Sequence, residues 1–148
     1  MIAANSKSIQ TERIEFGRLW WASLLAGLGA VVANALVYFI VSAADAIPNT
    51  VLVPGMNQPI TVVLVIINSF IPALLAGVLL ALLNRFTRRP VRSFRIIAAV
   101  LLLISLVNPL MIPGAPLTMI LALDFMHIVA AAIIVGVLTT VPVKERSM

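Results

Sequence analysis

Four long apolar runs constrain this fold more than any other feature of the sequence. They cover residues 19–44, 60–83, 94–111 and 117–141. A helix needs about 20 mostly apolar residues to cross the hydrocarbon core of a bilayer. Only 10% of the residues are charged, against about 25% in soluble domains, so a water-soluble core cannot bury this much apolar surface. The sequence therefore predicts an all-α, polytopic membrane protein, with residues 1–148 forming one bundle of four transmembrane helices.

The basic residues indicate how this bundle lies in the membrane. All ten lysines and arginines fall in the N-terminal tail, the segment 84–95 or the C-terminal tail, and the two other connectors contain none. Loops rich in Lys and Arg stay in the cytoplasm. We therefore expect a multi-pass protein of a cell (inner) membrane, bacterial in type, with both termini and the 84–95 loop cytoplasmic.

Composition also excludes several kinds of chemistry. The chain contains no cysteine, which rules out disulfides, thiolate metal sites and thiol redox relays. The net charge of +5 is explained by topology, so no nucleic-acid partner is predicted. The partners expected instead are the lipid bilayer and anionic lipid headgroups at the cytoplasmic loop, where the arginines either bind headgroups or only determine topology. These arginines are Arg85, Arg88, Arg89, Arg92 and Arg95.

Small residues recur at four-residue spacing within the apolar runs. One such stripe is Ala73, Gly77 and Ala81, and another is Ala132, Gly136 and Thr140. Small residues allow membrane helices to approach closely. The stripes predict close packing within the bundle, with a homo-oligomer or a larger membrane complex as the alternative.

Polar side chains inside the apolar runs mark the candidate site. At about 1.5 Å per helical residue, Asn34, Asn68 and His127 lie roughly 12–15 Å from the outer surface. Asp124 lies about one turn nearer that surface, level with Tyr38. Because residues three apart share a helix face, we expect Asp124 and His127 to be able to touch.

Three hypotheses fit this polar layer. The simplest is a structural clamp, in which the polar side chains hydrogen-bond the helices together. The second is a site that binds a proton or a small ligand, since ionisable residues inside membranes are often functional. The third is metal or haem ligation by His127, with Met126, Met119 or a partner chain as second ligand.

Catalytic patterns are otherwise missing from the sequence. It contains no glycine-rich phosphate loop, no HExxH motif and no arguable Ser–His–Asp set. We therefore predict no catalytic residue, metal site or cofactor, and favour a non-enzymatic accessory or small-ligand-sensing subunit. The alternative is an oligomeric proton-coupled transporter or channel that uses Asp124 and His127.

Three segments carry a resemblance to a known family. Arg18 to Trp21, Leu83 to Pro90 and Asp124 to His127 are similar to segments of a family of small bacterial four-helix integral membrane proteins of unknown function. The resemblance implies a four-helix membrane fold and a recurrent acid/histidine turn in the last helix. It implies no activity, cofactor or substrate.

Overall fold

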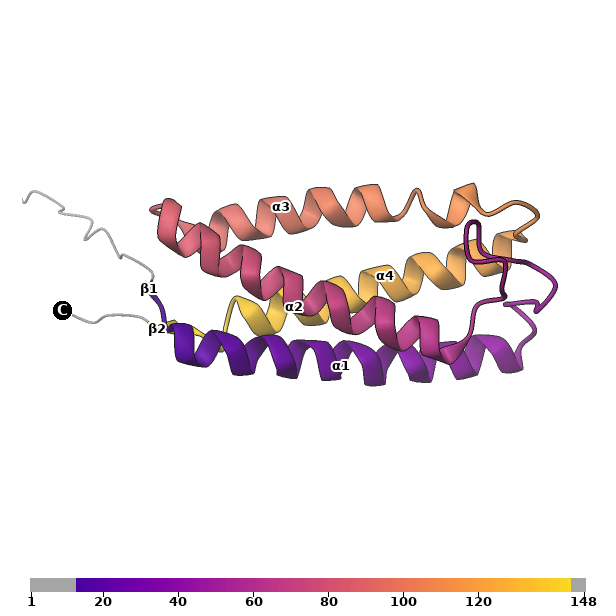
Figure 1. Cartoon of the computed structure of the whole chain (residues 1–148), viewed down its shortest axis with the longest axis horizontal. Helices are drawn as coiled ribbons and strands as arrows, with labels where there is room; N and C mark the ends of the chain where they lie inside the picture. The colour runs from indigo at the N-terminus through magenta and orange to yellow at the C-terminus, as the bar shows by residue number, and fades with distance from the viewer. Residues whose placement is uncertain (1–12, 145–148) are drawn as a thin grey trace, which may run out of the picture.

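Four long antiparallel helices make up the computed structural model, which describes residues 13–144 (Figure 1). They are α1 (Phe16–Ala43), α2 (Val62–Phe86), α3 (Pro90–Ser105) and α4 (Leu117–Leu138), with a 3-10 helix, η1 (Pro109–Met111), after α3. With α3 and η1 taken together, all four are long and apolar enough to cross a membrane. The predicted four-helix, multi-pass membrane fold is confirmed.

A short β ribbon closes one end of the bundle. Strand β1 (Arg13–Ile14) pairs antiparallel with β2 (Val143–Lys144), and the Glu15 amide donates to the Pro142 carbonyl at 3.1 Å. The connection between α2 and α3 lies at this same end, and the two other connectors lie at the opposite end (Figure 1). The apolar runs had not predicted the ribbon. Residues 1–12 and 145–148 of the expected domain lie outside the described part of the chain.

The helices around the arginine segment are longer than the sequence suggested. The expected loop 84–95 shrinks to residues 87–89, because α2 continues to Phe86 and α3 begins at Pro90. Proline suits the first turn of a helix, where its missing N–H has no intrahelical partner to lose. Arg85 therefore belongs to α2, and Arg92 and Arg95 belong to α3, although all three were expected in the loop.

The other end of α3 is shorter than expected. The helix ends at Ser105 instead of continuing to Met111, and residues 106–108 form a turn before η1. Pro109 cannot donate the backbone hydrogen bond that would continue the helix. The third membrane segment is therefore a helix, a turn and a short 3-10 helix.

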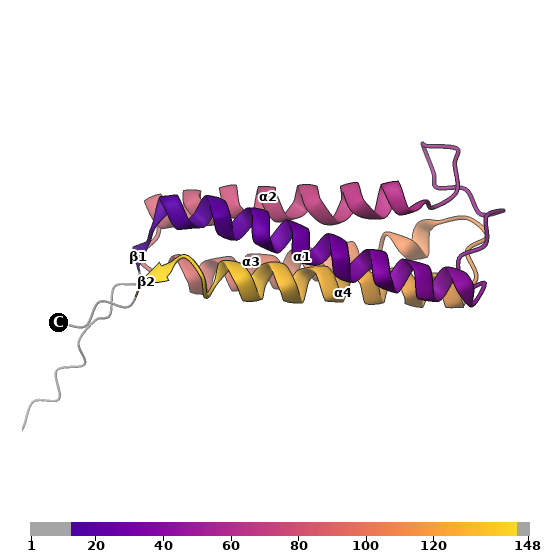
Figure 2. The same ribbon diagram turned by 90° about the horizontal axis from the view of Figure 1, so that it is seen from below.

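Helix α1 is the packing centre, and α3 is the outlying helix. α1 packs along α2 and α4, whereas α3 contacts α2 and α4 more sparsely and lies on the far side from α1 (Figures 1 and 2). Ala22, Ala26, Ala30 and Ala73 are fully buried in this α1-centred core. On α3 the buried residues are confined to its first turns, Pro90 to Phe94. The bundle is tight on the α1 side and loose on the α3 side.

The two small-residue stripes behave differently. A Cβ atom at Gly77 would meet Ser23 of α1, so the α2 stripe permits close helix packing as predicted. A Cβ atom at Gly136 would meet nothing within 4 Å, and Ala132, Gly136 and Thr140 are all exposed. The prediction of bundle packing is therefore wrong for the α4 stripe, because this stripe faces away from the other helices. The alternative, that a stripe of small residues mediates a homo-oligomer, remains a prediction.

Candidate functional site

A large cavity lies where α3 stands apart from the other helices. Its volume is about 890 Å³, and its walls come from α2, α3 and α4, with one residue, Asn34, from α1. Residues of the connectors between α1 and α2 and between α3 and α4 close the cavity at the end opposite the ribbon. Small-molecule sites in proteins have volumes of about 300–1,000 Å³, so the cavity is large enough for a ligand.

The lining of the cavity is mostly apolar, with a few polar groups. No Asp, Glu, Lys or Arg lines it among the residues described. The polar lining residues are Asn34, Asn68, Ser69, Ser105, Asn108 and His127. An apolar wall with a few fixed polar groups is typical of ligand pockets. Three residues of the predicted polar layer thus share this cavity.

Asn34 is the most deeply buried of these groups. It is 4% exposed, and its Nδ2 donates to Ser69 Oγ at 3.0 Å, which ties α1 to α2. Its Oδ1 is buried without a hydrogen-bond partner among the described residues. A buried amide oxygen without a donor costs about 1–3 kcal/mol. Asn34 therefore ties α1 to α2 behind the cavity wall, and its Oδ1 is shielded from the cavity.

His127 is the ionisable side chain in the cavity lining of the described chain. Its Nδ1 lies 2.8 Å from the Leu123 carbonyl oxygen one turn earlier. A carbonyl can only accept, so this bond assigns the proton of the neutral ring to Nδ1. The Nε2 atom then carries a lone pair and is the nitrogen left for a ligand.

Asn68 lies at the edge of the cavity and is exposed, in contrast to its predicted place in a buried layer. Its Nδ2 donates to the Leu64 carbonyl at 2.9 Å, within the same helix. Pro72 stands four residues later in α2 and has no N–H for the Asn68 carbonyl. Asn68 therefore offers a side-chain and a main-chain oxygen at the cavity wall, and it does not clamp two helices.

Asp124 and Tyr38 are not part of the cavity lining. In the described structure no hydrogen bond or ion pair joins Asp124 to His127, and Asp124 Oδ1 is buried without a partner. His127 Nδ1 bonds to the Leu123 carbonyl instead. The Tyr38 hydroxyl donates to the Ile60 carbonyl at 3.2 Å. Tyr38 thus ties α1 to the start of the second membrane segment.

Ser69 is the partner that sequence reasoning missed. It is 2% exposed, and its hydroxyl oxygen accepts the side-chain hydrogen bond from Asn34 that joins α2 to α1. Its position next to Asn68, at the depth of Asn34, was the available signal. A serine is easily overlooked because it often bonds to its own helix, as Ser23 does with Leu19.

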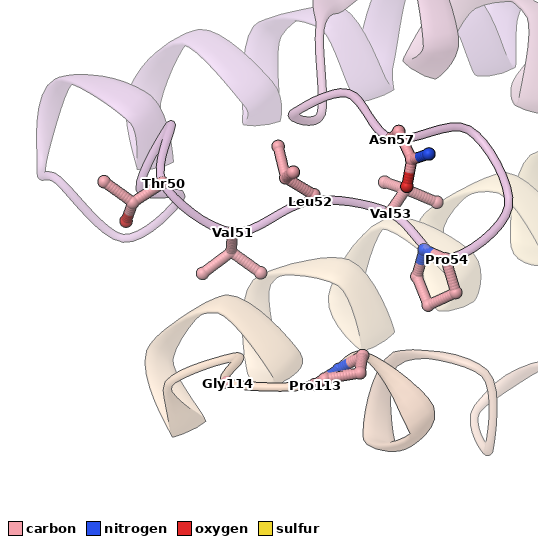
Figure 3. Close-up of a pocket in the computed structure, with 8 residues that line it drawn as sticks. All are labelled: Thr50, Val51, Leu52, Val53, Pro54, Asn57, Pro113 and Gly114. Carbon is pink, nitrogen blue, oxygen red and sulfur yellow. The ribbon is translucent and has the colours of Figure 1, made fainter.

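A second hollow lies between the connector from α1 to α2 and the connector from η1 to α4. It has a volume of about 510 Å³ and lies where the segment Thr50 to Asn57 faces Pro113 and Gly114 (Figure 3). No charged side chain lines it among the residues described. Metal ligands are also missing here, since residues 13–144 contain no cluster of three His, Cys, Asp or Glu residues. The hollow offers the Thr50 hydroxyl, the Asn57 amide and backbone groups, but no charged side chain.

Comparison with known proteins places the chain in a family. The model of a family of unknown function, DUF6069, matches residues 14–142. The chain belongs to DUF6069. No curated protein and no solved structure matches it. The match extends from β1 to the residue before β2, so it includes all four helices and the cavity of this DUF6069 chain. The recurrent acid/histidine turn stays a prediction.

The arginines of this DUF6069 chain gather at the ribbon end of the bundle. All five between Arg85 and Arg95 are exposed. Arg85 lies 5.9 Å from the centre of the Phe86 ring, and Arg95 donates to the buried Thr139 hydroxyl at 3.2 Å. Arg18, at the start of α1, forms an ion pair with Glu15 at 3.0 Å. This end of the molecule is therefore strongly basic.

Proposed function

We propose that this protein is a non-enzymatic membrane subunit that binds a small lipophilic molecule within its bundle, in an accessory or sensing role. The observation that carries the proposal is the cavity of about 890 Å³, whose lining is mostly apolar, has no charged residue in the described chain and includes His127. A structural clamp alone would not require so large an apolar volume between the helices. A bound lipophilic molecule would fill this volume.

A photolabelling experiment tests whether the cavity takes a ligand. The probe is a long-chain alkane that carries a diazirine, added to the purified protein in lipid nanodiscs. We expect saturable labelling of peptides from α2, α3 and α4 that line the cavity. Labelling that rises linearly with probe concentration, or that falls only on lipid-facing helix surfaces, would overturn the proposal.

Two neighbouring alanines of α3 supply a matched control. Ala98 lines the cavity, whereas Ala99 does not and is exposed. The substitution Ala98→Phe should weaken saturable labelling because the ring occupies part of the cavity, and Ala99→Phe should leave it intact. Equal effects of the two substitutions would argue against the cavity as the site.

We also propose that the arginine end faces the cytoplasm of a bacterial inner membrane and contacts anionic lipid headgroups. The support is the exposure of all five arginines at the end that also holds Arg13 and Lys144 of the ribbon. Polybasic segments near a membrane surface gain about 1 kcal/mol per Lys or Arg from anionic lipid. The test reconstitutes the protein in vesicles with and without phosphatidylglycerol and measures its preference for the anionic lipid. Substituting Arg88 and Arg89 by Gln should reduce this preference only if headgroups bind there.

A second candidate function is proton-coupled transport by an oligomer. The observation in its favour is Asp124, whose buried Oδ1 lacks a partner and whose carboxyl could exchange a proton. Proteoliposomes loaded with a pH-sensitive dye test this function. A proton flux that disappears in Asp124→Asn would support transport, and the absence of flux in the parent protein would exclude it.

A further inference from the structure

We propose that the bound molecule is an anionic phospholipid, which places its headgroup on the arginines at the joined ends of α2 and α3 and one acyl chain in the cavity between these helices. The inference rests on the proposed function and names its ligand, because it makes the cavity and the arginine end two parts of one site. Three observations carry it: the cavity opens toward lipid, arginines surround one end of the same helix pair, and the distance between the two parts matches one leaflet.

The cavity opens sideways toward the bilayer. Leu75 of α2 and Leu101 of α3 both line it, and they are 62% and 54% exposed. Pro72, on the same α2 wall, is exposed as well. A hydrocarbon chain can therefore enter between α2 and α3 without crossing water. Because no charged residue of the described chain lines the cavity, the acyl chain fits inside and a charged headgroup stays outside.

The arginines stand at one end of the same helix pair. Residues 87–89 connect α2 to α3, and the two helices diverge from this connector toward the other end of the bundle (Figure 1). Arg85 lies in the last turn of α2, Arg88 and Arg89 belong to the connector, and Arg92 lies in the first turn of α3. All four are exposed, so a headgroup at this end meets cations from both helices.

Phe94 separates the cavity from the arginines. It is 1% exposed, packs in one buried cluster with Leu80 and Val91, and is the lining residue of α3 nearest the arginine end. The cavity is therefore closed toward the arginines, and a headgroup cannot follow the acyl chain inside. The lipid lies on the surface at the arginine end, and its chain turns inward beyond Phe94.

The charge of the arginine end selects an anion. Residues 84–95 contain five arginines and no acid. Glu15 lies at the same end, but it pairs with Arg18 of α1, on the far side of the bundle from α3. Guanidinium groups bind phosphate through several N–H donors. A zwitterionic headgroup brings a cation of its own, which these arginines repel, so an anionic lipid is favoured.

The distance from the arginines to the opening matches one leaflet. Leu75 precedes Arg85 by ten residues, and Leu101 follows Arg89 by twelve, so each pair is roughly 15–18 Å apart along its helix. Half of a hydrocarbon core of about 30 Å is roughly 15 Å. An acyl chain whose headgroup lies on the arginines therefore reaches the opening with its terminal carbons.

A photoreactive phospholipid tests the ligand class. The probe is phosphatidylglycerol with a diazirine near the end of one acyl chain, and its control is the matching phosphatidylcholine. Each is titrated into phosphatidylcholine nanodiscs that hold the full chain. We expect saturable labelling of the cavity-lining peptides by the phosphatidylglycerol probe, at a mole fraction roughly 5-fold lower than for the phosphatidylcholine probe.

Arg89 and Arg18 supply a matched pair of single-charge variants. Both are exposed at the ribbon end, but Arg89 stands between α2 and α3 and Arg18 lies on α1. Arg89→Gln should weaken cavity labelling by the phosphatidylglycerol probe roughly 5-fold, because one headgroup contact is lost. Arg18→Gln should change it by less than about 2-fold, since general attraction of the lipid to this end is screened.

The alkane photolabel controls for folding. It has no headgroup, so Arg89→Gln should leave its saturable labelling of the cavity unchanged. If Arg89→Gln does not fold, Arg85→Gln makes the same test from α2, where the Arg85 side chain is exposed beside Phe86.

The outcomes separate this inference from the proposed function. Weaker phosphatidylglycerol labelling in Arg89→Gln, with alkane labelling intact, supports one molecule that uses both parts. Unchanged phosphatidylglycerol labelling in Arg89→Gln, an equal loss in Arg18→Gln, or equal labelling by the two phospholipid probes overturns the inference and leaves the binding function standing. No saturable alkane labelling in the parent protein overturns the binding function itself, and the inference fails with it.

Discussion

Replacing Gly77 with alanine tests the closest helix contact of the bundle. An ideal Cβ atom at Gly77 would overlap with Ser23 Oγ and lie 2.9 Å from Ser23 Cβ. Ser23 is 3% exposed, and its hydroxyl is bonded to the Leu19 carbonyl at 2.8 Å. Rotation of the hydroxyl would not relieve the contact with Ser23 Cβ, so α1 and α2 must separate.

The magnitude follows from comparing two glycines. Overpacking of a core costs about 1–3 kcal/mol, while alanine is favoured over glycine by about 1 kcal/mol inside a helix. Gly136 is the matched control, because it also lies in a helix and a Cβ there meets nothing within 4 Å. The propensity gain is common to both variants, so Gly77→Ala should be less stable than Gly136→Ala by about 1–3 kcal/mol.

The measurement is the free energy of unfolding in detergent micelles, obtained by titration with sodium dodecyl sulfate and followed by circular dichroism. The exchange variant Ser23→Gly with Gly77→Ala should recover most of the loss, since it moves the missing side chain to the other helix. If Gly77→Ala is as stable as Gly136→Ala, the close packing of α1 on α2 is refuted.

Three further predictions follow from the same structure. Ser69→Ala should lower the free energy of unfolding by about 0.5–2 kcal/mol, because Asn34 Nδ2 loses its acceptor; no change in a denaturation titration would contradict the tie between α1 and α2. Asp124→Asn should be at least as stable as the parent, because Asp124 Oδ1 has no partner to lose; a loss of more than about 1 kcal/mol would restore the clamp hypothesis. The chain has no cysteine, so single-cysteine variants report which side of the membrane a residue faces. Met56→Cys should react with a membrane-impermeant maleimide in intact cells, and Arg88→Cys should react only after permeabilisation. The reverse pattern would contradict the proposed orientation.

The fold was readable from the sequence because one physical demand dominates it. Apolar runs of this length require lipid or burial, and in lipid each must form a helix to satisfy its own backbone. The four helices are where the runs predicted them. Their ends differ where local chemistry outweighs hydropathy, as at Pro90, which starts α3 early, and at Pro109, which ends the third segment's helix before Met111.

The site was only partly predictable, because the sequence gives the depth of a side chain in the membrane but not its direction. Helical rise gives the depth of Asn34 and His127, and both do line one cavity. Spacing along one helix does not determine the side-chain rotamers, however. His127 Nδ1 bonds to the Leu123 carbonyl, and no hydrogen bond joins His127 to Asp124 in the described chain. The partnership of Asn34 with Ser69 depends on how α1 and α2 are rotated about their axes, which depth does not determine.

The sequence by itself determined the class of molecule, the number of membrane helices and the segregation of basic residues to one end. These features depend only on the order of apolar and charged residues along the chain. Only the tertiary structure decided that α3 stands away from α1, that a cavity of about 890 Å³ separates it from α2 and α4, and that Asn34 Oδ1 lacks a donor. These features depend on side-chain packing between helices, which a one-dimensional pattern of hydropathy does not encode.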